Sequence, residues 1–358
     1  MNKRMNLLRY IFVLLVAASA VAFAQQPGAR TGPETDTSVI DAHGTAHVTR
    51  VIPLPPDLSP EAQKRVGRQI SDATPHITLA ERRRNTDAWQ ARAAAAMKAV
   101  YPANVAESNI AGVPVRIVTP REIPTANRKR VMLNIHGGGF NSDSGSLVET
   151  IPIANLTQTK VVAVLYRLAP EHPFPAAVDD VIAVYKELLK TYPAKNIGMY
   201  GTSAGAMLTA EVAVRMRQLG LPLPAALGVF SGTGDFSRPG DSEEMYTLQG
   251  LGGHLVPLAP NAIHDPGYVG KASPRDPVLS PLFANVHGFP PTLFISATRD
   301  ALLSGTTILQ RHLYESGVES PMVIFEGLPH AFWYDVSLPE SREALGVMAK
   351  FLDSHVGK

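Results

Sequence analysis

The chain contains no cysteine. This absence excludes disulfide bonds, thiolate nucleophiles, thiolate metal sites and a lipid anchor on cysteine. Charged residues are also scarce, at 18% of the 358 positions, whereas 45% of the positions are hydrophobic. This composition is typical of a folded protein stabilised by a large apolar core, because a disordered chain is more polar and more highly charged.

The sequence has one long apolar run, and it lies at the N-terminus. Lys3, Arg4 and Arg9 come before and around its start, residues 10–20 are almost wholly apolar, and Ala22-Phe23-Ala24 matches the small-x-small pattern cut by signal peptidase. The layout predicts a secretory signal peptide over residues 1–24 and an exported protein, periplasmic or extracellular. The alternative is an uncleaved anchor helix, but the run is short for a membrane span.

A surplus of basic charge is also lacking once this leader is set aside. The leader carries three basic residues and no acidic ones, so the mature chain would have 30 Lys and Arg against 31 Asp and Glu. Its net charge is then near −1, which gives no support for a nucleic-acid partner. No later segment is apolar for long enough to predict a membrane span after cleavage.

The rest of the chain changes character twice. Residues 25–59 are rich in Pro, Gly, Thr and Asp and are expected to form a flexible lead-in, whereas residues 60–102 are helix formers and predict two or three helices. From residue 103 short apolar runs alternate with amphipathic stretches, which is typical of a doubly wound, mostly parallel α/β sheet. An interval rich in Gly and Pro, at about 234–281, interrupts this alternation as an insertion.

The alternation predicts individual elements by residue range. Strands are expected at 113–118, 131–135, 161–165, 197–200, 226–230, 292–296 and 322–325. Helices are expected at 176–191, 204–219, 305–316 and 337–355.

The strongest chemical signal is Gly201-Thr202-Ser203-Ala204-Gly205, which follows one predicted strand and opens one predicted helix. Gly-x-Ser-x-Gly in this context predicts a nucleophile elbow, because the sharp turn needs small neighbours and raises the serine hydroxyl above the sheet. The alternative is a turn of small residues with no catalytic role. Such a turn could have the same sequence, but it would not have to lie between a strand and a helix. Ser203 is therefore the candidate nucleophile.

A second motif, His136-Gly137-Gly138-Gly139-Phe140, follows the strand predicted at 131–135. Consecutive glycines let backbone N–H groups converge on one point, which suits an oxyanion hole for a tetrahedral intermediate. The Gly-Lys-Ser/Thr ending of a phosphate-binding loop is absent. His136 and Gly137 are expected to support this loop.

A serine nucleophile needs a base and an acid that orients the base, and in this fold they follow the serine in the order acid, then histidine. Asp300 follows the strand predicted at 292–296, and His330 follows the strand predicted at 322–325. Carboxyl ends of parallel strands meet at one edge of a sheet, so these side chains are expected to lie near Ser203. The competing histidines downstream of Ser203 are His312, within a predicted helix, and His254, His264 and His287, in or beside the insertion.

Together these motifs, with Tyr166–Glu171 and Phe174–Ala177, resemble the bacterial hormone-sensitive-lipase-like esterases of the α/β-hydrolase fold. The resemblance covers residues 103–358, and Thr202 resembles the branch of the family with Thr before the nucleophile. It implies Ser203, Asp300 and His330 as a catalytic triad. It also implies an oxyanion hole made by the N–H groups of Gly138, Gly139 and Ala204.

The same resemblance implies a helical cap built from residues 60–102 and 234–281, and a structural role for Tyr166–Glu171 behind the glycine loop. One departure is Ser304, where the family usually has a second Asp, and another is Ala331, where it usually has Gly. The expected substrate is a small-molecule ester, of short acyl chains, with no metal and no organic cofactor. An amidase or lactonase with the same triad, and a binding protein on an inactive hydrolase scaffold, remain as alternatives.

Overall fold

The computed structural model describes residues 37–68, 77–252 and 266–357, so the predicted leader and the start of the lead-in lie outside the described residues. The chain divides into two units, one ending at Pro53 and one beginning at Leu54. In the first unit, β1 (Thr37–Ile40) and β2 (Ala46–Thr49) form an antiparallel hairpin. This differs from the flexible lead-in expected for these residues.

The hairpin has a local cause. Its strands contain β-branched residues, which favour extended backbone. Between them the Asp41 carboxylate accepts hydrogen bonds from the N–H groups of His43 (2.8 Å) and Thr45 (3.0 Å), which stabilises the turn.

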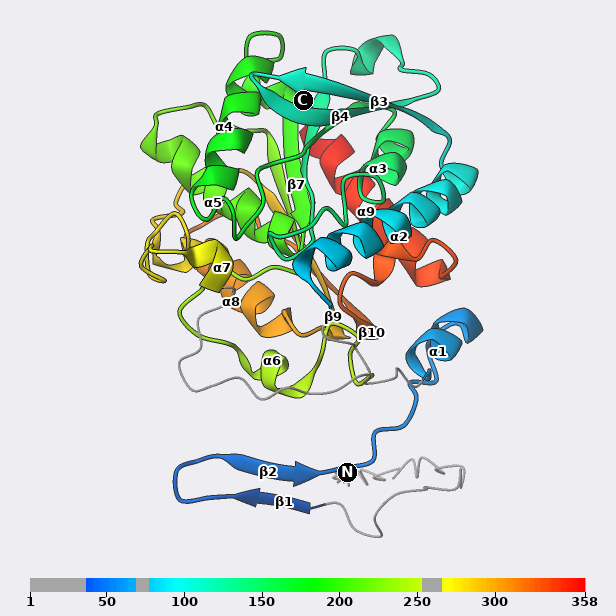
Figure 1. The fold of residues 1–358 in the computed structure, drawn as a ribbon, viewed down its shortest axis with the longest axis vertical. Coiled ribbons are helices and arrows are strands. Elements are labelled where there is room, and N and C mark those ends of the chain that lie inside the picture. The colour runs from blue at the N-terminus through cyan, green and yellow to red at the C-terminus, as the bar shows by residue number, and fades with distance from the viewer. Residues whose placement is uncertain (1–36, 69–76, 253–265, 358) are drawn as a thin grey trace, which may run out of the picture. The chain divides into compact units, whose positions relative to one another are not determined.

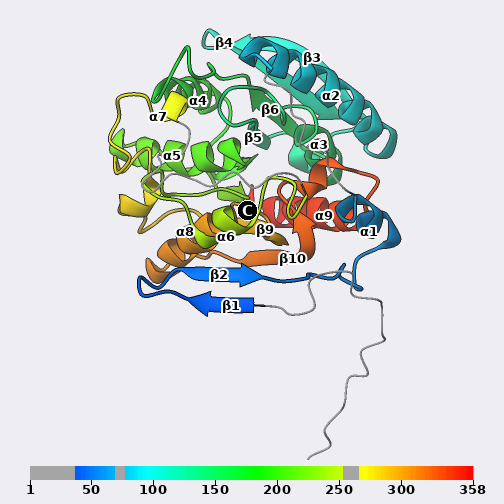
Figure 2. The same ribbon diagram turned by 60° about the horizontal axis from the view of Figure 1, so that its bottom comes forward.

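The second unit is built on one eight-stranded sheet. Its order is β10-β9-β8-β7-β5-β6-β4-β3, and Figure 2 shows β9 and β10 at one end and β3 and β4 at the other. The six strands β10, β9, β8, β7, β5 and β6 pair in parallel with their neighbours in this order. Strand β4 pairs antiparallel with both β6 and β3. The strand bounds are β3 (Ala103–Ile110), β4 (Val113–Pro120), β5 (Val131–Ile135), β6 (Lys160–Val164), β7 (Ile197–Thr202), β8 (Ala226–Phe230), β9 (Thr292–Arg299) and β10 (Met322–Pro329).

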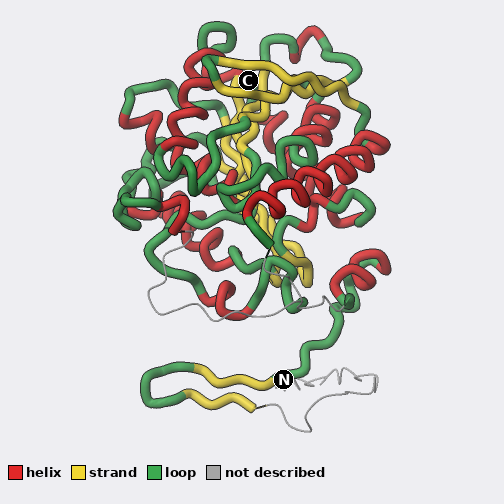
Figure 3. Tube along the Cα trace, viewed as in Figure 1, coloured by secondary structure: helices red, strands yellow, loops and turns green. Residues whose placement is uncertain are grey.

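Helices cover both faces of this sheet (Figures 1 and 3). One buried cluster joins the sheet to α4 (Ala176–Leu188), α5 (Ala204–Gln218) and α8 (Leu303–Glu315). A second cluster joins the opposite face to α2 (Leu79–Val100), α3 (Thr150–Thr157) and α9 (Pro339–His355). The predicted α/β-hydrolase architecture, a doubly wound and mostly parallel sheet, is therefore confirmed.

All seven predicted strands and all four predicted helices are present, with ends that shift by a few residues. In the second unit, outside the ranges expected to form a cap, one strand and one α-helix were not predicted. β3 lies at the sheet edge with all of its residues half-buried or exposed, so it lacks the apolar run by which its neighbours were recognised. α3 is short and contains β-branched residues and a proline, and its burial in the second cluster stabilises it where its helix propensity is weak.

The two ranges expected to form a cap contain one long helix and three short ones among the described residues. α1 (Pro60–Val66) and α2 lie within 60–102, and α6 (Asp241–Met245) and α7 (Pro266–Val269) lie within 234–281, whose described part contains no strand. Ser242 of α6 and Ser304 of α8 exchange two hydrogen bonds from N–H to Oγ, of 3.0 and 2.9 Å. The residue that departs from the family pattern, Ser304, therefore attaches the insertion to the helix that follows Asp300.

Helix α2 supplies a test of how firmly the first of these ranges packs. Met97 is fully buried against the second cluster, whereas Val100, one turn later, is 43% exposed. Met97→Ala should lower the free energy of unfolding by about 2–5 kcal/mol, because it removes a buried side chain and leaves a cavity. Val100→Ala is the matched control and should change it by less than about 0.5 kcal/mol in urea denaturation. Equal losses of unfolding free energy in the two variants would contradict the packing of α2 on the second buried cluster.

Candidate active site

The candidate site lies where the strand order reverses. The chain passes from β5 to β6 on one side, and β7 then pairs with β5 on the other side. Parallel α/β sheets bind ligands at the carboxyl ends of strands at such a switch point. The loop His136–Phe140 leaves β5 there, and Ser203 leaves β7 there, next to it.

Ser203 has the strained backbone of an elbow, with φ 59° and ψ −124° between β7 and α5. The residues two positions before and two positions after Ser203 are glycines because the backbone of β5 passes very close to them. A Cβ on either Gly201 or Gly205 would overlap the carbonyl oxygen of Ile135. The two glycines of the motif are therefore required by packing, and they bring Ser203 against the loop that follows Ile135.

Asp300 and His330 lie together at the ends of the neighbouring strands β9 and β10. The Asp300 Oδ1 and His330 Nδ1 atoms are 2.9 Å apart, and Asp300 is fully buried. The other carboxylate oxygen, Oδ2, accepts hydrogen bonds from the hydroxyls of Ser231 and Ser296. Burial alone would raise the pKa of Asp300, but His330, the Ser231 hydroxyl and the Leu302 N–H hold that pKa below its ordinary value.

The glycine loop lies directly against the elbow. Gly138 (φ 125°), Gly139 (φ 59°) and Phe140 (φ 59°) have left-handed backbones, which turn the chain sharply. A Cβ on Gly137 would lie 3.4 Å from the Ser203 Cβ. Among the described residues, the N–H groups of Gly138 and Gly139 donate to no protein acceptor, so both remain available to a ligand.

The segment predicted to support this loop does contact it. The Tyr166 ring stacks on the His136 ring with centroids 4.2 Å apart, and its hydroxyl donates to the His136 carbonyl oxygen (2.8 Å). The Ala169 N–H donates to the Phe140 carbonyl oxygen (2.9 Å). On its other side Phe140 stacks on Tyr268 of α7, with centroids 3.7 Å apart. The insertion and the segment after β6 therefore both hold the loop in place.

Three acidic or aromatic contacts at the site were not expected from the sequence. Asp143 pairs with Arg116 (2.5 Å), and although burial alone would raise the pKa of this carboxyl, the neighbouring His136, Ser146 and Arg116 hold it well below its usual range. Trp333 donates from Nε1 to the Thr202 hydroxyl (3.2 Å). This bond joins the segment after His330 to the residue before Ser203.

The third contact is centred on Glu149, at the start of α3. Its Oε1 accepts hydrogen bonds from the Gly137 N–H (3.0 Å) and the Tyr334 hydroxyl (2.5 Å), and its Oε2 accepts one from Asn134 (2.8 Å). Burial raises the pKa of Glu149 to about 7, since these donors offset the loss of solvent only in part. An isolated acid thirteen residues after His136 was the available signal, and it was too weak to interpret.

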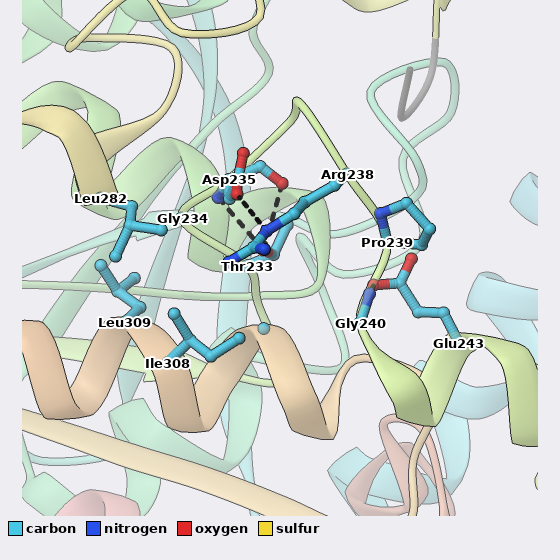
Figure 4. Close-up of a pocket in the computed structure, with 11 residues that line it drawn as sticks. Thr233, Gly234, Asp235, Arg238, Pro239, Gly240, Glu243, Leu282, Ile308 and Leu309 are labelled. Atoms are coloured by element: carbon cyan, nitrogen blue, oxygen red, sulfur yellow. Dashed lines mark hydrogen bonds and ion pairs between the residues drawn. The ribbon is translucent and has the colours of Figure 1, made fainter. Parts of the chain in front are cut away.

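A cleft of about 630 Å³ opens beside His330. Trp89 and Arg92 of α2 line it, and so do Leu248 of the insertion and residues 329–332 and 334–338. A second hollow, between the loop after β8 and α8, has room for about one water molecule (Figure 4). Asp235 and Arg238 pair across its rim at 3.4 Å. This hollow is too small for an ester substrate, so the cleft beside His330 is the candidate substrate site.

Within the described ranges, no group of three or more His, Asp or Glu side chains is placed to hold a metal ion. Over the same part of the chain, no helix is both long and apolar enough to cross a membrane.

The raised pKa of Glu149 has a measurable consequence for stability. Between the ordinary glutamate pKa of 4.5 and the folded-state pKa of about 7, the unfolded chain ionises before the folded one does. Stability should therefore fall as pH rises through this window, by about 3 kcal/mol from this residue. Glu149→Gln should abolish that part of the fall. Parallel pH profiles of unfolding for the two proteins, from pH 4.5 to 8, would contradict the assignment.

The fold and these contacts agree with comparisons to known proteins. A family model described as the alpha/beta hydrolase fold matches residues 132–334. An acetyl-hydrolase of Streptomyces hygroscopicus is 31% identical over 242 residues, which cover 66% of this chain and 79% of that protein. An esterase of Acinetobacter venetianus is 28% identical over 240 residues, which cover 64% and 76%.

Solved structures are similar over still more of the chain. The crystal structure of esterase E25 has a TM-score of 0.74 at 30% identity and covers 86% of this chain and 98% of its own. An esterase from the bacterial hormone-sensitive lipase family has a TM-score of 0.71 at 26% identity and covers 83% and 99%. The chain therefore belongs to the α/β-hydrolase fold family, among the bacterial hormone-sensitive-lipase-like esterases, and is a carboxylic ester hydrolase.

Proposed function

We propose that this esterase is an exported serine carboxylesterase that hydrolyses small-molecule esters of short acyl chains through an acyl-enzyme intermediate. The observation that carries the proposal is the pairing of His330 with the buried Asp300 at the edge of the sheet where the elbow presents Ser203. A base held by an ionised acid, near a serine on a strained turn, is the arrangement that acyl transfer needs.

In the proposed mechanism His330 accepts the Ser203 proton as the hydroxyl attacks the ester carbonyl. Asp300 holds the imidazole by its Nδ1 atom, so that Nε2 is the nitrogen that takes the proton. The N–H groups of Gly138, Gly139 and Ala204 stabilise the negative charge on the carbonyl oxygen. His330 then protonates the leaving alcohol, and water releases the acid by the reverse sequence, without a metal or an organic cofactor.

One observation supports short acyl chains: the relative from Streptomyces hygroscopicus is named an acetyl-hydrolase. The cleft beside His330 is bounded by residues from α2 and from the insertion, the two segments that we assign to a cap. Thr202, tied to Trp333, is consistent with the branch of the family that has Thr before the nucleophile.

Hydrolysis of a p-nitrophenyl ester series, from acetyl to palmitoyl, tests the function. Activity should be highest for the shortest chains, and Ser203→Ala should lower kcat by several orders of magnitude, because no other group replaces the nucleophile. Thr306→Ser, a conservative change at a buried hydroxyl of α8, is the control and should stay active. Full activity in Ser203→Ala would overturn the mechanism. Faster turnover of lactones or anilides would favour the lactonase or amidase, and no turnover of any substrate would favour an inactive scaffold.

Export is tested separately, by N-terminal sequencing of the protein recovered from the periplasm or the medium of a producing bacterium. Cleavage after Ala24 should leave Gln25 as the first residue, since Ala22-Phe23-Ala24 is the small-x-small pattern of the leader. Replacing Ala24 with a bulky residue should block cleavage. A chain that keeps its leader and sediments with membranes would instead indicate an anchor.

A further inference from the structure

One buried carboxyl oxygen lies between two loops that the proposed mechanism needs. Glu149 Oε1 accepts from Gly137, the first glycine of the loop after β5, and from Tyr334, four residues after His330. A Cβ on Gly137 would lie 2.9 Å from the Tyr334 hydroxyl and 3.4 Å from the Ser203 Cβ. The oxygen that joins the two loops therefore lies close behind the nucleophile.

We propose that Glu149 is a positioning residue for ester hydrolysis, whose Oε1 atom sets the spacing between the oxyanion loop and the segment that carries His330. The inference rests on the proposed function, because it assigns those two loops their roles. Glu149 itself does not touch the substrate. It acts through Gly137 and Tyr334.

The position of this oxygen is fixed from several sides. Asn134 of β5 holds Oε2 (2.8 Å), and the Tyr200 hydroxyl of β7 donates to the Glu149 main-chain oxygen (3.1 Å). Gly145 packs so closely that a Cβ there would overlap Oε1. A carboxyl fixed from β5, β7 and its own loop can transmit a defined geometry to the Tyr334 hydroxyl.

Tyr334 in turn is held on its other side. Its ring lies 5.9 Å from the Trp89 ring of α2, centroid to centroid, and the adjacent Trp333 donates to Thr202. The turn of residues 332–334 follows Ala331, which has a left-handed backbone (φ 50°) although it is not glycine. Such a conformation persists only where the surroundings hold it. The Tyr334–Glu149 bond ties this strained turn to the glycine loop, and the Tyr334 hydroxyl also neighbours the hydroxyls of Thr202 and Ser144.

The proposed role needs an acceptor oxygen rather than a negative charge. No ion pair to Glu149 exists among the described side chains; its partners are the neutral donors of Gly137, Tyr334 and Asn134. A glutamine keeps Oε1 as an acceptor for the first two. The new NH₂ group of the glutamine would face Asn134, whose Oδ1 is buried without a partner. A flip of the Asn134 amide would turn this Oδ1 toward the glutamine, where it can accept the new hydrogen bond. Glutamine should therefore replace Glu149 with little loss, whereas alanine should not.

The experiment measures kcat and KM for p-nitrophenyl acetate in wild type, Glu149→Ala, Glu149→Gln and Tyr334→Phe. Glu149→Ala and Tyr334→Phe should lower kcat about 10- to 100-fold, because misplaced catalytic groups slow the chemical step. KM should stay within about threefold, since binding of the ground state is little affected. Glu149→Gln should keep kcat within about threefold of wild type. The double variant Glu149→Ala/Tyr334→Phe should be little slower than either single one.

Tyr185→Phe is the matched control for loss of a buried tyrosine hydroxyl. Tyr185 is fully buried in α4, and its hydroxyl donates to the Pro222 carbonyl oxygen (2.8 Å), remote from the site. It should lose stability without losing kcat. Unchanged kcat in a folded Glu149→Ala, or a kcat for Glu149→Gln as low as for Glu149→Ala, would overturn the positioning role while Ser203→Ala remains inactive. Undiminished hydrolysis by Ser203→Ala would overturn the proposed function itself, and the inference with it.

Discussion

The close approach of β7 to β5 is the constraint on which the site depends. Gly201 and Gly205 bring the start of α5 against the Ile135 carbonyl oxygen, at a distance that no side chain permits. This contact places the Ser203 turn beside the glycine loop, because that loop begins at the next residue after Ile135. The arrangement of the remaining loops follows from the order of the parallel strands on either side.

Three carboxyl groups are buried near the site, and they differ in the partners that stabilise them and in the direction in which their pKa values shift. Asp300 faces His330 and the Ser231 hydroxyl, and Asp143 faces His136, Ser146 and Arg116, so the pKa of each lies below its ordinary value. Glu149 has only neutral donors, and its pKa is raised to about 7. Charge is therefore retained at the acid that orients the histidine, whereas the carboxyl that links the loops does not need it.

The surroundings of the glycine loop come from segments far apart in the chain. Tyr166 supports the loop from behind, Tyr268 of the insertion stacks on Phe140, and Tyr334 reaches it through Glu149. Each contact combines an aromatic ring with either a hydrogen bond or a stacked partner. A loop with three consecutive left-handed residues is thus held without a regular element of its own.

The sequence by itself determined the fold class, the seven strands and four helices recognised by their periodicity, and the candidates Ser203, Asp300 and His330. These were accessible because apolar period, motif spelling and strand-to-loop order are local properties of the chain. Only the tertiary structure decided the exposed edge strand β3, the short helix α3, and the contact between Glu149 and Tyr334. Those depend on burial and on contacts between residues up to 185 positions apart, and no local pattern encodes such contacts.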